Sequence, residues 1–349
     1  MADVLLEVRD LRVQFPTPDG LVKAVDGVSF RIARGESLGV VGESGSGKSV
    51  TFLTIMGLIT RKEARIEGEV IFRGQNVLEW PQDEMRLVRG KGMAMVFQDP
   101  MTSLHPFYRV GDQIAEAILA HEKVSRQAVR ARAVEMLRKV GIPRPDARAR
   151  QYPHEFSGGM RQRAMIAMAL SLNPDLLIAD EPTTALDVTV QAQILDLIDR
   201  LKEEFHTAVV IITHDLGVVA EHCEEIMVMY AGKAAEYGTR QDIYYDALHP
   251  YTWGLLRSIS RIDRPRTERL RPIAGQPPSL IFVPSGCSFH PRCPYVMDVC
   301  RVTVPELLAA DGKHASACHL PLSEKKRIFA EEVAIQSRGG PTRQGTWDG

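Results

Sequence analysis

The sequence predicts an α/β fold organised around a phosphate-binding loop, and three features support this prediction. The stretch Gly42-Glu43-Ser44-Gly45-Ser46-Gly47-Lys48-Ser49 reads G-x-x-x-x-G-K-S, in which the glycines let successive backbone N–H groups point at phosphate oxygens. The loop follows a short apolar run, 37–41, and precedes a stretch without Pro or Gly, 49–56. A strand should therefore lead into the loop, and a helix N-terminus should face the phosphates. Further along the chain, an apolar strand ends in two adjacent carboxylates, Asp180 and Glu181.

Length and composition describe an ordinary globular chain. With 349 residues it is long enough for a full core and for two domains. Apolar residues make up 44%, charged residues 25%, and the formal net charge is −1, so no bulk field would attract nucleic acid. No apolar run approaches the ~18 residues of a membrane span, and the charged amino terminus does not resemble a signal peptide. Five cysteines in such a chain favour a reducing compartment.

Strands are predicted on both sides of the loop. Before it, short β-rich runs alternate with turn residues at 5–8, 11–15, 28–32 and 38–41. Beyond it, strands are expected at 68–72, 93–97, 175–181 and 208–213, and a hairpin at 226–237. The order of these elements fits a sheet with helical crossovers.

Helices are predicted between the strands. Apolar residues recur at helical spacing over 110–120, 125–140 and 188–205. Ser157-Gly158-Gly159 opens another helix, 160–172. A serine before a helix is an ordinary N-cap, but two glycines weaken the first turn. They make sense where an anion must approach the helix N-terminus closely.

The polar residues at these positions indicate nucleotide chemistry. Lys48 would reach the β- and γ-phosphates, and the Ser49 hydroxyl would bind Mg²⁺. Asp180 would hold that Mg²⁺ through water, while Glu181 would polarise an attacking water. His214 follows the buried strand 208–213, at the carboxyl edge of a parallel sheet, where such folds bind ligands.

Taken together, these stretches resemble the ATP-binding cassette of ABC transporters over about residues 4–245. The resemblance implies a RecA-like core with an antiparallel β subdomain and a helical subdomain, 99–170. It implies that Phe15 stacks on adenine, that Gln98 links Mg²⁺ and the attacking water to the transport subunits, and that His214 contacts the γ-phosphate. Catalysis would involve Glu181, His214 and Gln98. Nucleotide binding would involve Phe15, Gly42, Ser44, Gly45, Ser46, Gly47, Lys48, Ser49, Val50, Ser157, Gly158 and Gly159, and Mg²⁺ would contact Ser49, Gln98 and Asp180.

Two positions depart from the commonest cassette pattern. The resemblance makes 42–49 the Walker A loop and Phe156-Ser157-Gly158-Gly159-Met160 the signature motif. Met160 replaces the usual glutamine of the signature, and Val50 replaces a hydroxyl residue after Ser49 of the Walker A loop. Val50 keeps its backbone N–H for phosphate, so neither change removes a catalytic group. The resemblance also makes Ala185-Leu186-Asp187 the D-loop.

Four stretches narrow the resemblance to the ATPase subunits of oligopeptide and dipeptide importers. They are GESGSGKSVT from Gly42, FQDPMTSLHP from Phe97, YPHEFSGGMRQR from Tyr152 and HPYT from His249. The resemblance divides the chain into a nucleotide-binding domain, 1–245, and that family's C-terminal extension, 246–325. Residues 326–349 are expected to form a flexible tail.

This resemblance implies an ATPase located peripherally at the cytoplasmic face of the cell (inner) membrane. Its partners would be two transmembrane permease subunits and a second, homologous ATPase subunit that pairs head to tail, with an extracytoplasmic substrate-binding protein acting indirectly. Three alternatives stay open. One is an importer of another small cargo, such as nickel or a glutathione-like molecule. Another is a soluble ABC ATPase without a transport role, which usually carries long coiled coils or two cassettes per chain, and the sequence has neither. The third is a non-hydrolysing pseudo-cassette that serves as a scaffold, which the intact Glu181 and His214 disfavour.

Four of the five cysteines gather near the end of the sequence, as Cys287-x5-Cys293-x6-Cys300-x17-Cys318. The surrounding segment is rich in Pro and shows little regular spacing of apolar residues, so we expect it to need a covalent or metal cross-link to be ordered. Disulfides do not suit a reducing compartment, and the usual C-x2–4-C spacing of zinc sites is missing, although His290, His314 and His319 stand nearby. Resemblance to the importer extension favours a [4Fe–4S] cluster held by the four thiolates, with Zn²⁺ as the alternative and a metal-free segment as the third possibility.

Overall fold

The structure of the chain, a computed structural model, describes residues 3–184, 186–258 and 273–333. The chain divides into two compact units, each assembled from separate stretches. The first comprises Met1–Leu11, Ser29–Leu38 and Ser49–Ile212, and the second comprises Arg12–Val28, Gly39–Lys48 and Thr213–Gly349. Ala185 of the expected D-loop and most of the expected tail lie outside the described residues. In the part of the chain that is described, no helix is long and apolar enough to cross a membrane.

Three parallel strands form the centre of the first unit. β6 (Met93–Val96), β7 (Leu176–Asp180) and β8 (Ala208–Thr213) lie in the order β8-β7-β6. Leu176 of β7 stands opposite Met93 on one side and Ala208 on the other. Every residue of these strands is buried, which explains their continuous apolar runs. Parallel pairing brings their carboxyl ends to one edge of the sheet.

An antiparallel sheet contains β1 (Val4–Thr17), β2 (Gly20–Ala33), β4 (Arg65–Phe72) and β5 (Gln75–Asn76), in the order β2-β1-β4-β5. The prediction of two separate strands at 5–8 and 11–15 is wrong, because β1 runs through both. Asp10 has a φ of 45°, and the buried positions shift there from Leu6 and Val8 to Leu11 and Val13. The strand therefore changes phase at Asp10 without ending.

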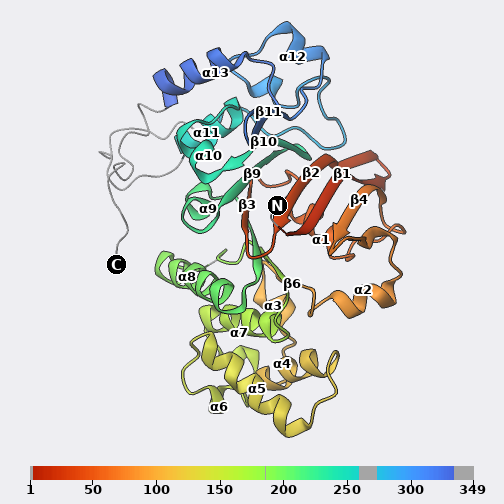
Figure 1. Cartoon of the computed structure of the whole chain (residues 1–349), viewed down its shortest axis with the longest axis vertical. Helices are drawn as coiled ribbons and strands as arrows, with labels where there is room; N and C mark the ends of the chain where they lie inside the picture. The colour runs from red at the N-terminus through yellow and green to blue at the C-terminus, as the bar shows by residue number, and fades with distance from the viewer. Residues whose placement is uncertain (1–2, 185, 259–272, 334–349) are drawn as a thin grey trace. The chain divides into compact units, whose positions relative to one another are not determined.

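The helices that follow β6 in the sequence pack together in the first unit. α3 (Pro100–Ser103), α4 (Val110–Leu119), α5 (Arg126–Lys139), α6 (Pro145–Arg148) and α7 (Gly158–Leu170) contact one another, as Figure 1 shows in yellow and yellow-green. The same unit contains η1 (Val77–Glu79), α2 (Gln82–Val88), η2 (Pro153–Glu155) and α8 (Val188–Phe205), while α1 (Lys48–Ile55) begins in the phosphate-binding loop. The helices predicted at 110–120, 125–140, 160–172 and 188–205 are confirmed. Their observed first and last residues differ from the predicted ones by no more than two.

The second unit contains an antiparallel ladder in the order β11-β12-β10-β9. Its strands are β9 (Glu225–Tyr230), β10 (Lys233–Thr239), β11 (Leu308–Asp311) and β12 (His314–Ser316). The predicted hairpin is β9–β10, joined by Ala231 and Gly232 at φ values of 47° and 79°. β12 pairs with β10, placing Ser316 opposite Glu236. The segment expected to lack regular structure therefore adds two strands to the hairpin.

The helices of the second unit are α9 (Leu216–His222), α10 (Arg240–Tyr245), α11 (Pro250–Ser258), η3 (His290–Arg292), α12 (Asp298–Val302), α13 (Leu322–Ile328) and η4 (Phe329–Val333). All but α9 and α10 belong to the C-terminal segment, residues 246–333. Trp253 of α11 is buried with Ala247, Ile328, Phe329 and Val333 in one apolar cluster. α13 and η4 continue packed structure past the boundary expected at residue 325. The C-terminal segment thus has an apolar core of its own. β3 (Ser37–Val41) is shared between the two units.

Candidate functional site

The loop 42–48 is curled so tightly that two of its glycines admit no side chain. A Cβ on Gly47, which has a φ of 98°, would lie 2.2 Å from the carbonyl oxygen of Ala24. A Cβ on Gly42 would lie 2.2 Å from the carbonyl oxygen of Met229. Both clashes are with backbone, which cannot move aside as a flexible side chain could. The sequence prediction of a glycine-dependent loop is therefore confirmed in its geometry.

Lys48 and Ser46 supply the polar groups of this loop. Lys48 is buried, and its Nζ donates to the carbonyl oxygens of Gly42 at 2.7 Å and Glu43 at 3.0 Å. These carbonyls hold the ammonium at the mouth of the loop. Among the described side chains, the Oγ of Ser46 is buried without a hydrogen-bond partner. A buried hydroxyl without a partner is costly, and the oxygen of a bound phosphate would satisfy it.

In the first unit, Ser49 contacts Asp180, and the sequence predicts that both bind Mg²⁺ together with Gln98. Ser49 is the second residue of α1, and Asp180 is the last residue of β7. Ser49 Oγ donates to Asp180 Oδ1 at 3.0 Å, and Asp180 is only 7% exposed. A hydroxyl and a buried carboxylate in contact are oxygen donors that fit Mg²⁺, which binds one or two carboxylates together with phosphate oxygens.

Glu181 is held in a strained but well-supported position next to this pair. Its φ is 46°, a left-handed conformation that costs roughly 1–2 kcal/mol for a residue with a side chain. Its backbone N–H donates to the carbonyl oxygen of Ile212 at 2.8 Å. Gln98 Nε2 and Thr184 Oγ1 both donate to Glu181 Oε2, at 2.7 Å and 2.9 Å. The carboxylate is thus oriented by two side chains.

Thr184 was not among the site residues predicted from the sequence, whereas Gln98 was. The signal that could have found Thr184 is its spacing, because a hydroxyl three residues after a carboxylate can hydrogen-bond back to it across a turn. The backbone N–H of Thr184 also donates to the carbonyl oxygen of Glu181, at 3.2 Å. The turn therefore fixes the hydroxyl beside the carboxylate.

The signature residues present an open helix N-terminus. Ser157 caps α7, since its Oγ accepts from the N–H of Met160 at 3.4 Å. Ser157 and Gly158 are exposed. A Cβ on Gly159 would lie 2.9 Å from Val190 Cγ1, so a side chain there would press on α8. An exposed helix start with bare backbone can accept an anion brought by another molecule.

Two further site residues predicted from the sequence are His214, in the second unit, and Phe15, on β1. His214 is exposed and directly follows β8. Phe15 is partly buried on β1. Their predicted roles, on the γ-phosphate and on adenine, stay predictions.

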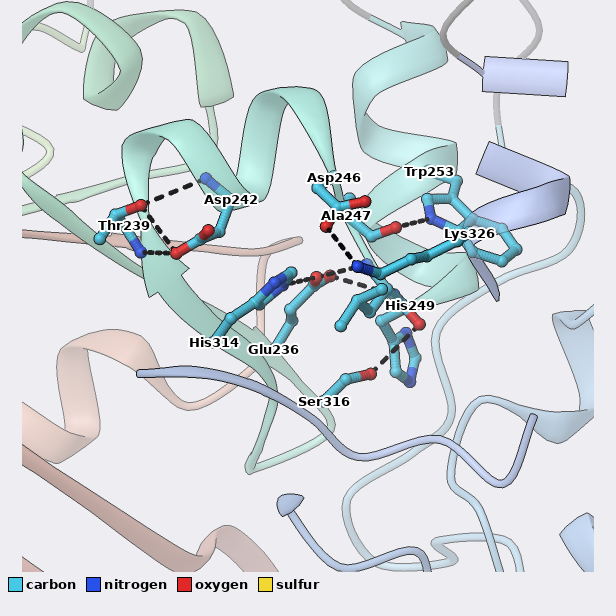
Figure 2. A network of polar contacts seen from close by, with 11 residues as sticks. Glu236, Thr239, Asp242, Asp246, Ala247, His249, Trp253, His314, Ser316 and Lys326 are labelled. Atoms are coloured by element: carbon cyan, nitrogen blue, oxygen red, sulfur yellow. Dashed lines mark hydrogen bonds and ion pairs between the residues drawn. The ribbon is translucent and has the colours of Figure 1, made fainter. Parts of the chain in front are cut away.

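A buried polar network fixes the chain that leads from β10 into α11 (Figure 2). Glu236 of β10 is 0% exposed and accepts from the backbone N–H groups of Leu248, at 2.5 Å, and His249, at 3.1 Å. His314 Nε2 lies 2.8 Å from Glu236 Oε1. Because carboxylate oxygens only accept, this nitrogen carries the hydrogen. One carboxylate therefore joins β10, β12 and the start of α11.

The four clustered cysteines approach one another but do not form a ligand set. Cys287 N–H donates to the carbonyl oxygen of Cys300 at 2.8 Å, and Cys293 interacts electrostatically with Cys318, Cys287 and Cys300. Burial raises the pKa of Cys287 to about 11 and the pKa of Cys293 to about 12, so both are neutral thiols at pH 7 when no metal ion is bound. The described residues contain no group of three or more His, Cys, Asp or Glu side chains arranged to hold a metal ion. The iron–sulfur or zinc prediction is therefore not supported by these donors as they stand.

Comparison with known proteins identifies the class. A family model described as "ABC transporter" matches residues 25–184. Among solved structures, the dimeric post-hydrolysis state of an ATP-binding cassette bound to ADP and Pi is 28% identical, with a TM-score of 0.61 over 68% of this chain and 99% of that one. The chain is an ABC-type ATPase with the P-loop fold, and ATP with Mg²⁺ is its nucleotide.

The curated relatives define the family more closely. The oligopeptide transport ATP-binding protein OppD of Salmonella typhimurium is 51% identical over 323 residues, 93% of this chain and 96% of the relative. The dipeptide transport ATP-binding protein DppD of Bacillus subtilis is 51% identical over 317 residues, 90% and 94% of the two chains. A second family model, "Oligopeptide/dipeptide transporter, C-terminal region", matches residues 235–300. The chain belongs to the family of oligopeptide and dipeptide transport ATP-binding proteins.

Proposed function

We propose that this chain hydrolyses ATP to drive the uptake of dipeptides and oligopeptides through membrane permease subunits. One observation supports the peptide cargo: the likeness to peptide-transport proteins extends past the nucleotide motifs into the C-terminal region. The test is uptake in a strain that lacks the chain and its partners, with all subunits supplied together. Labelled dipeptides and oligopeptides should enter, whereas uptake of nickel or glutathione in place of peptides would favour the alternative importer.

We propose distinct roles for the site residues. Lys48 and the loop around it bind the phosphates, with Ser44, Gly45 and Val50 contributing backbone N–H groups. Ser49, Asp180 and Gln98 serve Mg²⁺, Glu181 activates water, His214 contacts the γ-phosphate and Phe15 stacks on adenine. The hydrogen bond between Ser49 and Asp180 supports the Mg²⁺ assignment, and the hydrogen bond from Gln98 to Glu181 supports the assignment of Glu181.

The assembly that we propose is an importer with two permease subunits and a second, homologous ATPase subunit, supplied by a substrate-binding protein. The exposed signature at Ser157 and Gly158 supports head-to-tail pairing, in which each signature completes the partner's ATP site. In this arrangement the chain lies peripherally on the cytoplasmic face of the membrane. Co-purification with integral membrane proteins tests this proposal, and a chain that purifies only as a soluble ATPase would contradict it.

We propose that the helical block from Asp99 to Tyr152 receives the cytoplasmic helices of the permease. It directly follows Gln98, which contacts the carboxylate of Glu181. It also exposes large apolar side chains that have no role in its own core: Met101 is 50%, Phe107 82% and Tyr108 57% exposed. Such a group on a nucleotide-linked block fits a docking surface that transmits movement.

The substitution Phe107→Arg should reduce peptide uptake by about tenfold or more, since a charge in an apolar contact must be desolvated. ATP hydrolysis should continue, uncoupled from transport. Leu87→Arg is the matched control, because Leu87 is 70% exposed on α2 outside the block. Uptake and hydrolysis are measured in the reconstituted complex. Permease cross-links that form only with residues 246–349 would contradict the proposed surface.

We also propose the division of the chain into a nucleotide-binding domain, 1–245, and a C-terminal extension in which the four cysteines take up a [4Fe–4S] cluster, with Zn²⁺ as the alternative. The gathering of four thiols in one segment supports this. Binding would have to draw the thiols together and deprotonate them.

Anaerobically purified protein should then be brown, absorb near ~400 nm and contain about four irons per chain. Cys300→Ser should lose iron and colour, whereas Cys223→Ser should keep both, because Cys223 is a buried thiol of another region. Colourless protein with stoichiometric zinc would assign the site to zinc. Protein with neither metal would contradict both assignments.

A further inference from the structure

Glu43, the second residue of the phosphate-binding loop, forms an ion pair with an arginine from the C-terminal segment. Arg292 Nη1 donates to Glu43 Oε2 at 2.6 Å, and Arg292 Nη2 donates to Glu43 Oε1 at 2.9 Å. Two parallel bonds of this kind fix both direction and distance. The Arg292 side chain is only 4% exposed and that of Glu43 28%. These hydrogen bonds raise the pKa of Arg292 above its ordinary value.

A second residue of the C-terminal segment holds the backbone of Glu43. The hydroxyl of Tyr251 accepts from the Glu43 N–H at 2.8 Å. Tyr251 is fully buried, and its ring lies against Tyr230 and Phe289, at centroid distances of 4.7 Å and 5.5 Å. Glu43 is thus held by its side chain and by its backbone, from two different places in the C-terminal segment.

Arg292 and Tyr251 are themselves held in place by further hydrogen bonds. Arg292 Nε donates to the carbonyl oxygen of Ala274 at 3.0 Å. Tyr251 stands in the first turn of α11, and its N–H donates to His249 Nδ1 at 3.0 Å. Burial, followed by the charge of Lys325, lowers the pKa of His249 to about 3, so its ring is neutral and free to accept that bond. The Glu236 network in turn fixes the backbone of His249 (Figure 2).

The position of Glu43 matters because its backbone is part of the phosphate cradle. Its carbonyl oxygen accepts from Lys48 Nζ and from the N–H of Ser46, at 3.0 Å and 3.2 Å. Its carboxylate is a negative charge within the loop that must receive negative phosphates. An uncompensated carboxylate there would repel the nucleotide.

We propose that Arg292 and Tyr251 are positioning residues of the ATP site. They hold Glu43, and with it the loop 42–48, in the conformation that receives the phosphates, and Arg292 cancels the charge of Glu43. The C-terminal segment is accordingly part of the nucleotide-binding machinery. This inference rests on ATP binding by the loop, and it is independent of the cargo and of any metal at the cysteines.

The test is the dissociation constant of a fluorescent ATP analogue with Mg²⁺ on the purified full chain, together with the unfolding midpoint without nucleotide. Arg292→Ala should weaken binding about ten- to hundredfold, because a buried charge-assisted pair is lost and a carboxylate is left unpaired. Tyr251→Phe should weaken it several-fold, since it leaves the Glu43 N–H without its acceptor. Arg292→Lys should be intermediate, keeping the charge but losing the two-pronged geometry.

Rescue separates positioning from general stability. The double variant Glu43→Gln with Arg292→Gln removes both charges, so it should bind ATP more tightly than Arg292→Ala. Arg301→Ala, an exposed arginine of the same segment, should bind normally, and Lys48→Ala should lose binding as the reference for a disabled loop.

An Arg292→Ala protein with a lower unfolding midpoint and unchanged ATP affinity would overturn the proposal. Weakened binding in Arg301→Ala would overturn it too, because the effect would then not depend on the contact with Glu43. Should Arg292→Ala fail to fold, Arg292→Lys and Tyr251→Phe decide the question by the same two measurements. Normal ATP affinity in both would also refute the positioning role.

Discussion

Glu181→Gln should lower ATP turnover by about 10²–10⁴-fold, the usual contribution of a general base. The amide keeps the size of the carboxylate but cannot take a proton from water. Gln98 and Thr184 both donate hydrogen bonds to Glu181. The NH₂ group of the glutamine cannot accept them, so the orientation of the substituted side chain is also disturbed. ATP should still bind, because Lys48 and Ser49 are untouched.

The measurement is steady-state hydrolysis by the assembled complex, with ATP binding followed separately. Glu203→Gln is the matched control, an exposed position in the same unit that should hydrolyse normally. Hydrolysis from the second ATPase subunit of the proposed assembly is subtracted by repeating the assay with the ATP site of that subunit inactivated. A normal rate after this subtraction would mean that another group activates the water.

The largest effect on stability is expected at Glu236, on β10 of the second unit. Glu236→Ala should lower the free energy of unfolding by about 3–5 kcal/mol, as expected when one partner of a buried polar pair is removed. The change leaves the backbone N–H groups of Leu248 and His249 and the ring of His314 without their shared acceptor. Each buried donor left unpaired adds a cost.

Urea unfolding of the full chain measures this effect. Lys326→Ala supplies the control in the same region, because Lys326 pairs with Asp246 at 3.4 Å while the two side chains are 49% and 44% exposed (Figure 2). Such a surface pair contributes at most about 1 kcal/mol. A loss of similar size in both variants would show that the buried carboxylate has no special role.

The phosphate-binding loop and the strands around it could be predicted from sequence because their physics is local. A loop that cannot tolerate side chains must show glycines, as Gly42 and Gly47 do. A strand buried on both faces must be apolar along its length, as β7 and β8 are. The hydroxyl and carboxylates then follow from position, since Ser49 continues the loop and Asp180 ends a strand.

The grip on Glu43 could not be predicted, because its partners lie far away in the chain. Arg292 stands 249 residues after Glu43 and Tyr251 stands 208 residues after it. No periodicity links such positions, and an arginine beside a cysteine reads as an ordinary surface residue. β12 could not be predicted for a related reason. A strand of three residues is too short to show an alternation of apolar and polar residues, and its position depends on the edge of the hairpin with which it pairs.

That pairing has a consequence for the order of events during synthesis. β10 is made early, but its neighbour β12 arrives about eighty residues later, with Ser316 opposite Glu236. Closing a loop of that length costs about 4 kcal/mol of chain entropy. Until the ribosome has delivered β12, β10 presents an unpaired edge with a carboxylate whose histidine partner does not yet exist. Until β12 has been synthesised, this open edge of β10 can pair with a strand of another chain.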